Sequence, residues 1–275
     1  MATETSARVT RHACDLCGSL EWRNLPLPNP RDIGICGVCG FVYVRDRRES
    51  HVIASDWSGI YGEGYDPDKW PAVRARLSYV RDWIHEQYDL RREVSLLDVG
   101  AGTGTFINIV DERFNLEEMR GLEPSSAGGS HPFIAEGSVE DDIDLGLFDF
   151  VTINWTLENC HDPIRMLDYA RRSCKPDGRV VVATGSRILV PFKKPLSCYL
   201  GDNAPDLHCF RWSVRTLKAA MNKAGLMVDR INPYMECDWL VMSAKPDAQT
   251  KIDLPPFDPP ADVDRHFVSW QVTWP

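Results

Sequence analysis

The sequence lacks long apolar runs and any excess of positive charge. No stretch of its 275 residues approaches the roughly 18 consecutive apolar residues of a membrane-spanning helix, and residues 1–10 lack the apolar core of a signal peptide. We therefore expect a cytoplasmic protein without a membrane anchor. The net charge is −9, whereas proteins that bind nucleic acids usually present a basic face. This charge argues against a nucleic-acid partner.

Cysteines are concentrated near the start of the chain. Four of the nine cysteines form two pairs with the spacing Cys-x-x-Cys, and a glycine follows each pair. Two such pairs supply the four thiolates that Zn²⁺ prefers, and glycine lets the backbone turn tightly around the metal. A redox-active dithiol is the alternative, but two matched pairs favour a metal. We predict a structural zinc ribbon over residues 1–48, with the ligands Cys14, Cys17, Cys36 and Cys39.

Strand patterns and helix patterns alternate over residues 72–245. Apolar residues at helical spacing indicate a helix over 72–88, and further helices are expected at about 104–113, 163–174 and 214–224. This alternation predicts an α/β fold with a doubly wound, parallel, seven-stranded sheet. The expected strands cover residues 94–99, 118–123, 132–135, 148–154, 179–184, 226–232 and 238–244.

Three segments do not fit this alternation. Residues 49–71 interleave glycines with Tyr61 and Tyr65, which suits a linker that closes as a lid over a ligand; a surface loop whose rings pack on the core is the alternative. Residues 185–212 form a long insertion, which we place on the substrate side. Residues 246–275 are rich in proline and end in two tryptophans. This tail either docks on the body or on a partner, or it is a disordered extension.

A glycine-rich loop follows the first expected strand of the sheet. No lysine follows Gly104, which excludes a P-loop, and Thr105 stands where the dinucleotide fingerprint requires glycine. A small zwitterionic nucleoside fits better, because its amino-acid part can approach the loop closely where no Cβ obstructs it. Its ammonium group would meet backbone carbonyls and Asp98. The loop residues expected to touch this ligand are Gly100, Ala101, Gly102 and Gly104.

Two further features suit the nucleoside part of such a ligand. Glu123 lies 19 residues after Gly104, at the end of the second expected strand. A carboxylate there can accept hydrogen bonds from both ribose hydroxyls. Residues 136–140 follow the third expected strand, where backbone amides and the short side chain of Ser138 would lie beside an adenine edge.

These motifs resemble those of class I S-adenosylmethionine-dependent methyltransferases. Residues 98–104 with 121–125 resemble the cofactor site of that family, and residues 156–163 and 175–178 resemble two of its later motifs. The resemblance covers roughly residues 70–245 and implies a Rossmann-like methyltransferase sheet. It implies that S-adenosylmethionine is bound by Tyr61, Tyr65, Asp98, Gly100, Ala101, Gly102, Gly104, Glu123, Pro124, Ser138, Val139 and Asn154.

The order of the domains is similar to that of zinc-ribbon methyltransferases in sugar, surface-polysaccharide and natural-product biosynthesis. This resemblance implies a small-molecule acceptor, such as a sugar, a nucleotide-linked sugar or a related intermediate. An rRNA or tRNA methyltransferase whose ribbon contacts RNA is one alternative, and a non-catalytic protein that keeps the fold as an interaction scaffold is another.

Methyl transfer needs an in-line nucleophile and, for a hydroxyl or carbon acid, a base. In doubly wound folds such groups lie at the carboxyl edge of the sheet. His208 resembles a histidine at the edge of the family's substrate pocket, and His161 follows the fourth strand close to Asn159, where the family often has histidine. Glu158 is the third candidate. The alternatives are an exposed loop histidine at 161 and a structural histidine at 208.

Overall fold

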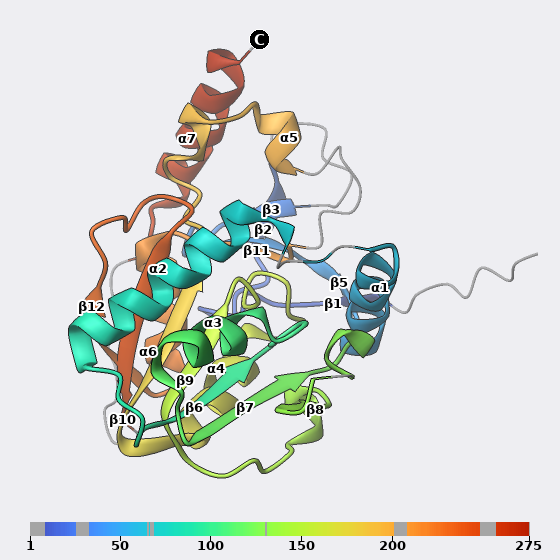
Figure 1. Ribbon diagram of the computed structural model, residues 1–275. Coiled ribbons are helices and arrows are strands. Elements are labelled where there is room, and N and C mark those ends of the chain that lie inside the picture. The colour runs from blue at the N-terminus through green and yellow to red at the C-terminus, as the bar shows by residue number, and fades with distance from the viewer. Residues whose placement is uncertain are drawn as a thin grey trace, which may run out of the picture.

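The computed structural model describes residues 9–25, 33–64, 66, 69–129, 131–200, 208–247 and 257–274. Its main body is a seven-stranded sheet with helices on both faces, and a smaller sheet is formed mainly by the start of the chain (Figure 1). Among the described residues, no helix combines the length and the apolar character needed to cross a bilayer.

The large sheet confirms the predicted seven-stranded α/β fold. Its strand order is β12-β13-β10-β9-β6-β7-β8. One part of the prediction is wrong, because β13 runs antiparallel to both of its neighbours. β12 and β13 are joined by a short connection without a crossover helix, and such a connection reverses the chain direction. The strands are β6 (Ser95–Val99), β7 (Glu118–Glu123), β8 (Ile134–Glu136), β9 (Phe148–Asn154), β10 (Cys174–Thr184), β12 (Leu226–Ile231) and β13 (Leu240–Pro246).

Helices cover both faces of this sheet. The helices α2 (Pro71–Tyr88) and α3 (Thr105–Phe114) pack together on one face, and α4 (Pro163–Arg172) and α6 (Val214–Lys223) pack on the other. Side chains of a strand alternate between the two faces. Accordingly, Val181 belongs to the core under α2 and α3, whereas Val180 and Val182 belong to the opposite core.

Local signals place the helix starts correctly, but one strand start differs from the prediction. The side chain of Asp162 accepts a hydrogen bond from the backbone of Arg165 at the start of α4, and Ser213 caps α6 in the same way. Residues 175–178 lie between the expected helix, which ends at 174, and the expected strand, which starts at 179, but they belong to β10, whose pairing with β9 is irregular between Cys174 and Arg179. The strand therefore absorbs these residues as a bulge.

The cysteine pairs adjoin a four-stranded antiparallel sheet with the order β11-β4-β3-β2: the first pair precedes β2, and the second spans the end of β3 and the turn before β4. Three of its strands come from the start of the chain, but β11 comes from the end of the segment 185–212 and pairs with β4. The ribbon and the methyltransferase part therefore share one sheet. The elements are β2 (Trp22–Asn24), β3 (Ile33–Cys36), β4 (Val42–Val44) and β11 (Phe210–Arg211), with β1 (Val9–Arg11) paired to β5 (Asp46–Arg48) and the short helices η4 (Val190–Phe192) and α5 (Leu196–Leu200) preceding β11.

Two segments without a clear helical pattern in the sequence form helices. Residues expected to be an irregular linker form α1 (Ser50–Gly62), although Gly59 and Gly62 are poor helix formers. The described part of the proline-rich tail forms α7 (Pro260–Thr273), which lies near α5 (Figure 1). This helix packs on β3 and buries Phe267 and Trp270. The tail thus docks on the body, against the ribbon.

Candidate active site

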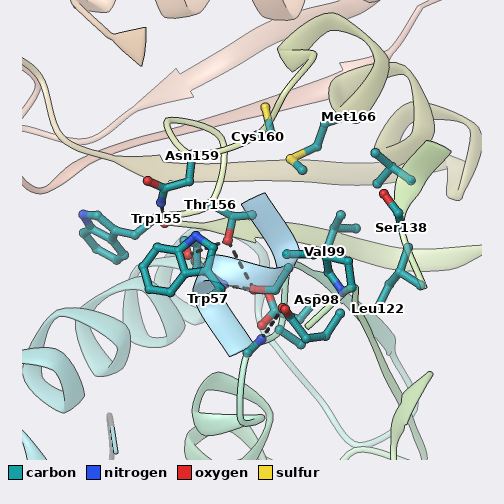
Figure 2. A pocket seen from close by; sticks show the side chains of 18 of the residues that line it. Trp57, Asp98, Val99, Leu122, Ser138, Trp155, Thr156, Asn159, Cys160 and Met166 are labelled. Atoms are coloured by element: carbon teal, nitrogen blue, oxygen red, sulfur yellow. Dashed lines mark hydrogen bonds between the residues drawn. The ribbon is translucent and has the colours of Figure 1, made fainter. Parts of the chain in front are cut away.

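A pocket lies at the carboxyl edge of the sheet, where β6, β7 and β9 end (Figure 2). Residues that follow these strands line it together with residues of α1 and α2. Its empty space, including the open mouth, is about 1180 Å³.

The glycine loop forms part of the pocket wall. Gly100 and Gly102 have φ angles of +76° and +55°, a region that favours glycine. A Cβ at Gly100 would lie 2.2 Å from the side chain of Thr156, and one at Gly102 would lie 2.7 Å from the hydroxyl of Tyr61. Gly104 is predicted to touch the ligand, but it packs against His131 and does not line the pocket.

Asp98 is a buried carboxylate beside this loop. Its Oδ1 accepts hydrogen bonds from Oγ1 of Thr152 at 2.7 Å and from Nδ2 of Asn154 at 2.9 Å. Burial, together with the negative charge of Glu123, raises the pKa of Asp98 to about 7. The Oδ1 atom of Asn154 is buried and has no hydrogen-bond partner. A cationic ligand group here would stabilise the Asp98 carboxylate and supply the donor that Asn154 lacks.

Glu123 holds the glycine loop in place. Its Oε2 accepts from the backbone N–H of Gly102 at 2.8 Å, and its Oε1 accepts from the backbone N–H of Ser125 at 2.9 Å and from the Ser125 hydroxyl. A carboxylate has about four acceptor positions, of which three are used here. Glu123 can therefore take one more hydrogen bond, and it can accept from two ribose hydroxyls if the Ser125 hydroxyl turns away.

The other predicted cofactor residues line the same pocket, with one outside the described residues. Pro124, Ser138 and Val139 follow β7 and β8, and Ser138 caps the short helix η3 (Val139–Asp141). Tyr61 reaches over the glycine loop from α1, with its ring 5.9 Å from that of Trp57. Tyr65 lies outside the described residues.

The three predicted catalytic residues are not brought together. His161 lines the pocket, whereas Glu158 and His208 do not. Nδ1 of His161 lies 2.8 Å from the carbonyl oxygen of Arg48. Because a carbonyl can only accept, Nδ1 carries the proton and the lone pair of the neutral ring is on Nε2.

The other two candidates, Glu158 and His208, make contacts within the protein outside the pocket. Glu158 is buried, which raises its pKa, and it accepts a hydrogen bond from Oγ1 of Thr184 at 2.8 Å. Its backbone carbonyl accepts from the N–H groups of Cys209 and Phe210, which ties the residues after β9 to β11. His208 is exposed, and its carbonyl accepts from Arg211 at 2.7 Å.

Sequence reasoning missed the residues of one pocket wall. Trp155, directly after β9, has the left-handed φ angle of +49°, which is rare for a bulky residue. The guanidinium of Arg76 lies 4.4 Å from the centre of its ring. Nδ2 of Asn159 donates to the carbonyl of Trp155 at 3.0 Å, and Figure 2 shows these two side chains near each other. One feature of the sequence could have indicated this wall: Arg76 is a charged residue between Val73 and Leu77, on the apolar side of an expected helix.

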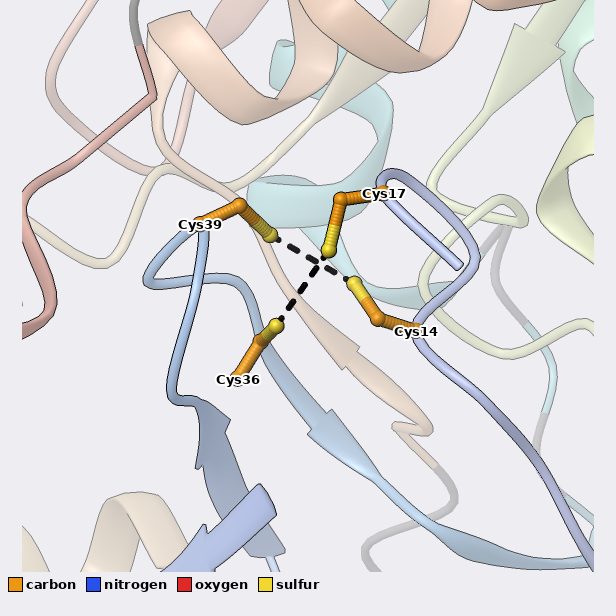
Figure 3. A group of neighbouring side chains, drawn as sticks. All are labelled: Cys14, Cys17, Cys36 and Cys39. Carbon is orange, nitrogen blue, oxygen red and sulfur yellow. Dashed lines mark hydrogen bonds between the residues drawn. The ribbon is translucent and has the colours of Figure 1, made fainter. Parts of the chain in front are cut away.

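The four paired cysteines converge on one point (Figure 3). Their sulfur atoms all lie within 4.8 Å of one another, with Cys14 and Cys39 at 3.4 Å and Cys17 and Cys36 at 3.5 Å. A tetrahedral Zn²⁺ with bonds of about 2.3 Å holds its sulfurs about 3.8 Å apart. The predicted glycine turns, Gly18 and Gly40, have φ angles of +74° and +67°. The cluster therefore fits a Zn²⁺ ion.

Comparison with solved structures identifies the fold of the large sheet. The chain resembles 1,6-didemethyltoxoflavin-N1-methyltransferase from Burkholderia thailandensis, solved with 1,6-didemethyltoxoflavin and S-adenosylhomocysteine, with a TM-score of 0.53 and 15% identity over 76% of this chain and 96% of that one. It also resembles the mitomycin 7-O-methyltransferase MmcR, with a TM-score of 0.50 and 18% identity over 64% of this chain and 54% of that one. At such identities the likeness shows the fold alone.

Sequence comparison identifies the family. No curated protein matches the sequence. Residues 72–231, more than half of the chain, match a family model described as "Methyltransferase domain". This match covers the glycine loop, Asp98, Glu123 and His161. The chain therefore belongs to the methyltransferase domain family, and the protein is an enzyme of the methyltransferase class.

Proposed function

We propose that the pocket binds S-adenosylmethionine and that the enzyme methylates a sugar, a nucleotide-linked sugar or a related small molecule. One observation carries this proposal. A loop free of side chains at Gly100 and Gly102 lies between two buried carboxylates, Asp98 and Glu123. This arrangement suits a ligand with a positively charged amino-acid part and a ribose.

Each part of the cofactor has residues that fit it. The amino-acid part would lie over Gly100 and Gly102, with its ammonium group near Asp98 and near the Oδ1 atom of Asn154, which has no partner. Glu123 would accept from the ribose. The adenine would lie at the end of the pocket where Leu122, Pro124, Ser138 and Val139 offer an apolar wall and a hydroxyl.

The bound cofactor supplies a methyl group on a sulfonium centre, and the protein must position the acceptor and remove its proton. His161 lines the pocket, and its Nε2 has the lone pair of the neutral ring, so we assign His161 as the base for an acceptor hydroxyl. Trp57 and Tyr61 line the pocket from α1 and would exclude water from the reaction.

The aromatic lining supports a small acceptor with a ring. Trp57, Tyr61 and Trp155 each face the pocket, and the flat faces of such rings pack against sugar rings as well as against planar ones. The net charge of −9 and the acidic residues of the pocket disfavour an RNA acceptor.

The cysteine cluster would hold a structural Zn²⁺ ion. All four ligand positions are filled by thiolates, which leaves no position for a substrate. None of the nine cysteines, all of which lie in the described part of the chain, forms a disulfide. This state suits the reducing cytoplasm, where we place the enzyme.

Two experiments, done one after the other, test the identity of the cofactor and the class of the acceptor. Calorimetry with S-adenosylmethionine should show one site per chain, and Asp98→Asn should weaken binding. Transfer of a tritiated methyl group should then be followed into a panel of free sugars, nucleotide-linked sugars and tRNA. Incorporation into a sugar supports the proposed acceptor class. Incorporation into tRNA alone would replace it, and a purified protein that does not bind S-adenosylmethionine would refute the proposal.

A further inference from the structure

A second cavity, called the groove below, opens beside the pocket between α1 and the residues that follow β7 and β8. Its empty space, including the open mouth, is about 1740 Å³. One part of its wall is the contact of α1 with the short helix η2 (Ser126–Gly128), where the N–H of Ser126 donates to Oγ of Ser58 at 3.0 Å (Figure 1). His161 lines both cavities. A molecule whose reacting hydroxyl lies at His161 can therefore extend into the groove.

Negative charge dominates the groove. Its lining residues, all of which lie in the described part of the chain, include five carboxylates, two histidines and one arginine. The arginine is Arg165, whose Nη2 donates to the carbonyl of Glu140 at 2.8 Å and to Oδ2 of Asp142 at 3.1 Å. Asp142 does not line the groove. The charge of Arg165 is thus paired with a carboxylate outside the lining, and it does not neutralise the carboxylates inside.

Two of the groove carboxylates are held in place by neutral donors. Oε1 of Glu140 accepts from the hydroxyl of Ser50 at 2.7 Å, and Oδ2 of Asp141 accepts from the backbone N–H of Ser138 at 2.8 Å. A neutral donor fixes a carboxylate without cancelling its charge. Because a carboxylate has about four acceptor positions, Glu140 and Asp141 can also accept hydrogen bonds from a ligand.

Serine hydroxyls accompany the carboxylates along the groove. Five serines line it: Ser50, Ser55, Ser58, Ser126 and Ser138. A carboxylate accepts from neighbouring hydroxyls of a ligand, and a serine hydroxyl both donates and accepts. This lining is complementary to a molecule rich in hydroxyl groups. An amino group on that molecule would add attraction, whereas a phosphate would be repelled.

We propose that the groove binds the methyl acceptor, as a subsite for a sugar that carries hydroxyl or amino groups and no phosphate. This inference rests on the proposed function and narrows it, because it favours free and amino sugars over nucleotide-linked sugars. A merely solvated acidic surface is the competing explanation. In that case a charge placed in the groove would not alter the affinity for any sugar.

The test uses glucosamine, glucose and glucose 1-phosphate, which share one ring and carry a positive charge, no charge and a negative charge. Their dissociation constants are measured by NMR titration of the full chain saturated with S-adenosylhomocysteine. The wild-type protein should bind glucosamine most tightly and glucose 1-phosphate most weakly. Equal affinities, tightest binding of glucose 1-phosphate, or binding of none of the three would overturn the proposal.

Ser55 is the position at which a charge can be placed in the groove. It is exposed on α1 and lines the groove but not the pocket. Ser55→Lys should weaken glucosamine by about 3- to 10-fold and strengthen glucose 1-phosphate, and Ser55→Glu should do the opposite. Glucose should change little. The effects of both variants should shrink at about 0.5 M salt, because salt screens exposed charges.

Ser269 provides the matched control, because it is an exposed serine on another helix, α7, and lines neither cavity. Ser269→Lys and Ser269→Glu should leave all three dissociation constants unchanged. Identical constants in Ser55→Lys and Ser55→Glu would overturn the groove as a sugar site. Calorimetry with S-adenosylhomocysteine precedes each titration, and wild-type protein that does not bind it would refute the proposed function instead. Circular dichroism establishes that each variant is folded.

Discussion

Nη2 of Arg47 lies 3.0 Å from Oδ1 of Asp15, and this ion pair connects the first cysteine pair to the pocket. Asp15 lies between Cys14 and Cys17, and the Arg47 side chain is fully buried. Nη1 of Arg47 also donates to the carbonyl of His161 at 2.9 Å. The ribbon therefore fixes the backbone of a residue that lines the pocket, and its role extends beyond stabilising its own fold.

Removal of the acidic partner should destabilise the protein strongly. Asp15→Ala leaves the Arg47 guanidinium buried without its counter-charge, and breaking a buried pair in this way costs about 3–5 kcal/mol. We expect a loss of this size in the free energy of unfolding, measured by urea denaturation. Arg11→Ala is the control, because the pair of Arg11 with Asp46 is largely exposed and its loss should have little effect. A loss for Asp15→Ala no larger than the control would contradict the buried-pair interpretation.

Removal of the Zn²⁺ ion should also destabilise the protein. Without Zn²⁺ the two cysteine turns lose their common anchor, and the first turn carries Asp15 as well as the carbonyls of Asp15 and Leu16, which accept hydrogen bonds from Lys223 of α6. We expect metal analysis to find about one zinc per chain, and we expect a strong chelator to lower the melting temperature by about 5 °C or more. Addition of Zn²⁺ should restore it. An unchanged melting temperature after verified zinc removal would argue against a structural site.

Much of the large sheet could be predicted because its signals are local. Asp162 and Ser213 cap their helices through contacts within three residues, and the apolar strands are recognisable by themselves. The helix α1 could not be predicted, because its glycines oppose helix formation and few of its residues are buried. The pairing of β11 with β4 joins residues more than 160 positions apart, which no local pattern shows.

The residues of the pocket also divide into those with a local sequence signal and those placed by distant contacts. Gly100 and Gly102 belong to a short motif and Glu123 ends the next strand at a typical interval, so their place in the pocket could be predicted from spacing. The place of Arg76 in the pocket wall could not, because Arg76 stacks on the ring of Trp155, whose left-handed backbone angle no local pattern indicates. His208 resembles a histidine of the family's substrate pocket, yet it lies outside the pocket, and the residues that follow it join the ribbon sheet.

Loss of the Glu123 carboxylate should weaken cofactor binding for two reasons. Glu123→Ala removes a charged acceptor for the ribose, and it also leaves the N–H of Gly102 without its partner. We expect S-adenosylmethionine to bind more weakly by about 1–3 kcal/mol, as measured by calorimetry. Unchanged affinity would count against the assignment of Glu123 to the ribose.

Ser125→Ala provides a matched control for the Glu123 variant. It removes one of the protein's own hydrogen bonds to Oε1 of Glu123 and keeps the carboxylate and its bond to Gly102. Because it frees an acceptor position for the ribose, we expect affinity to stay the same or to increase slightly. A loss as large as that of Glu123→Ala would mean that loop geometry, rather than the carboxylate, determines binding.

Binding of the cofactor should depend on pH through Asp98. Burial raises the pKa of this carboxyl to about 7 in the free protein, so below pH 7 it is largely protonated. A cationic ligand favours the ionised form, and binding at pH 6 must therefore release close to one proton, whereas binding at pH 8 releases almost none. Calorimetry in two buffers of different ionisation enthalpy measures this proton release directly. Affinity should rise with pH up to about 7 and then level off. Asp98→Asn, which cannot ionise, should abolish the proton release, and its persistence in that variant would assign it to another group.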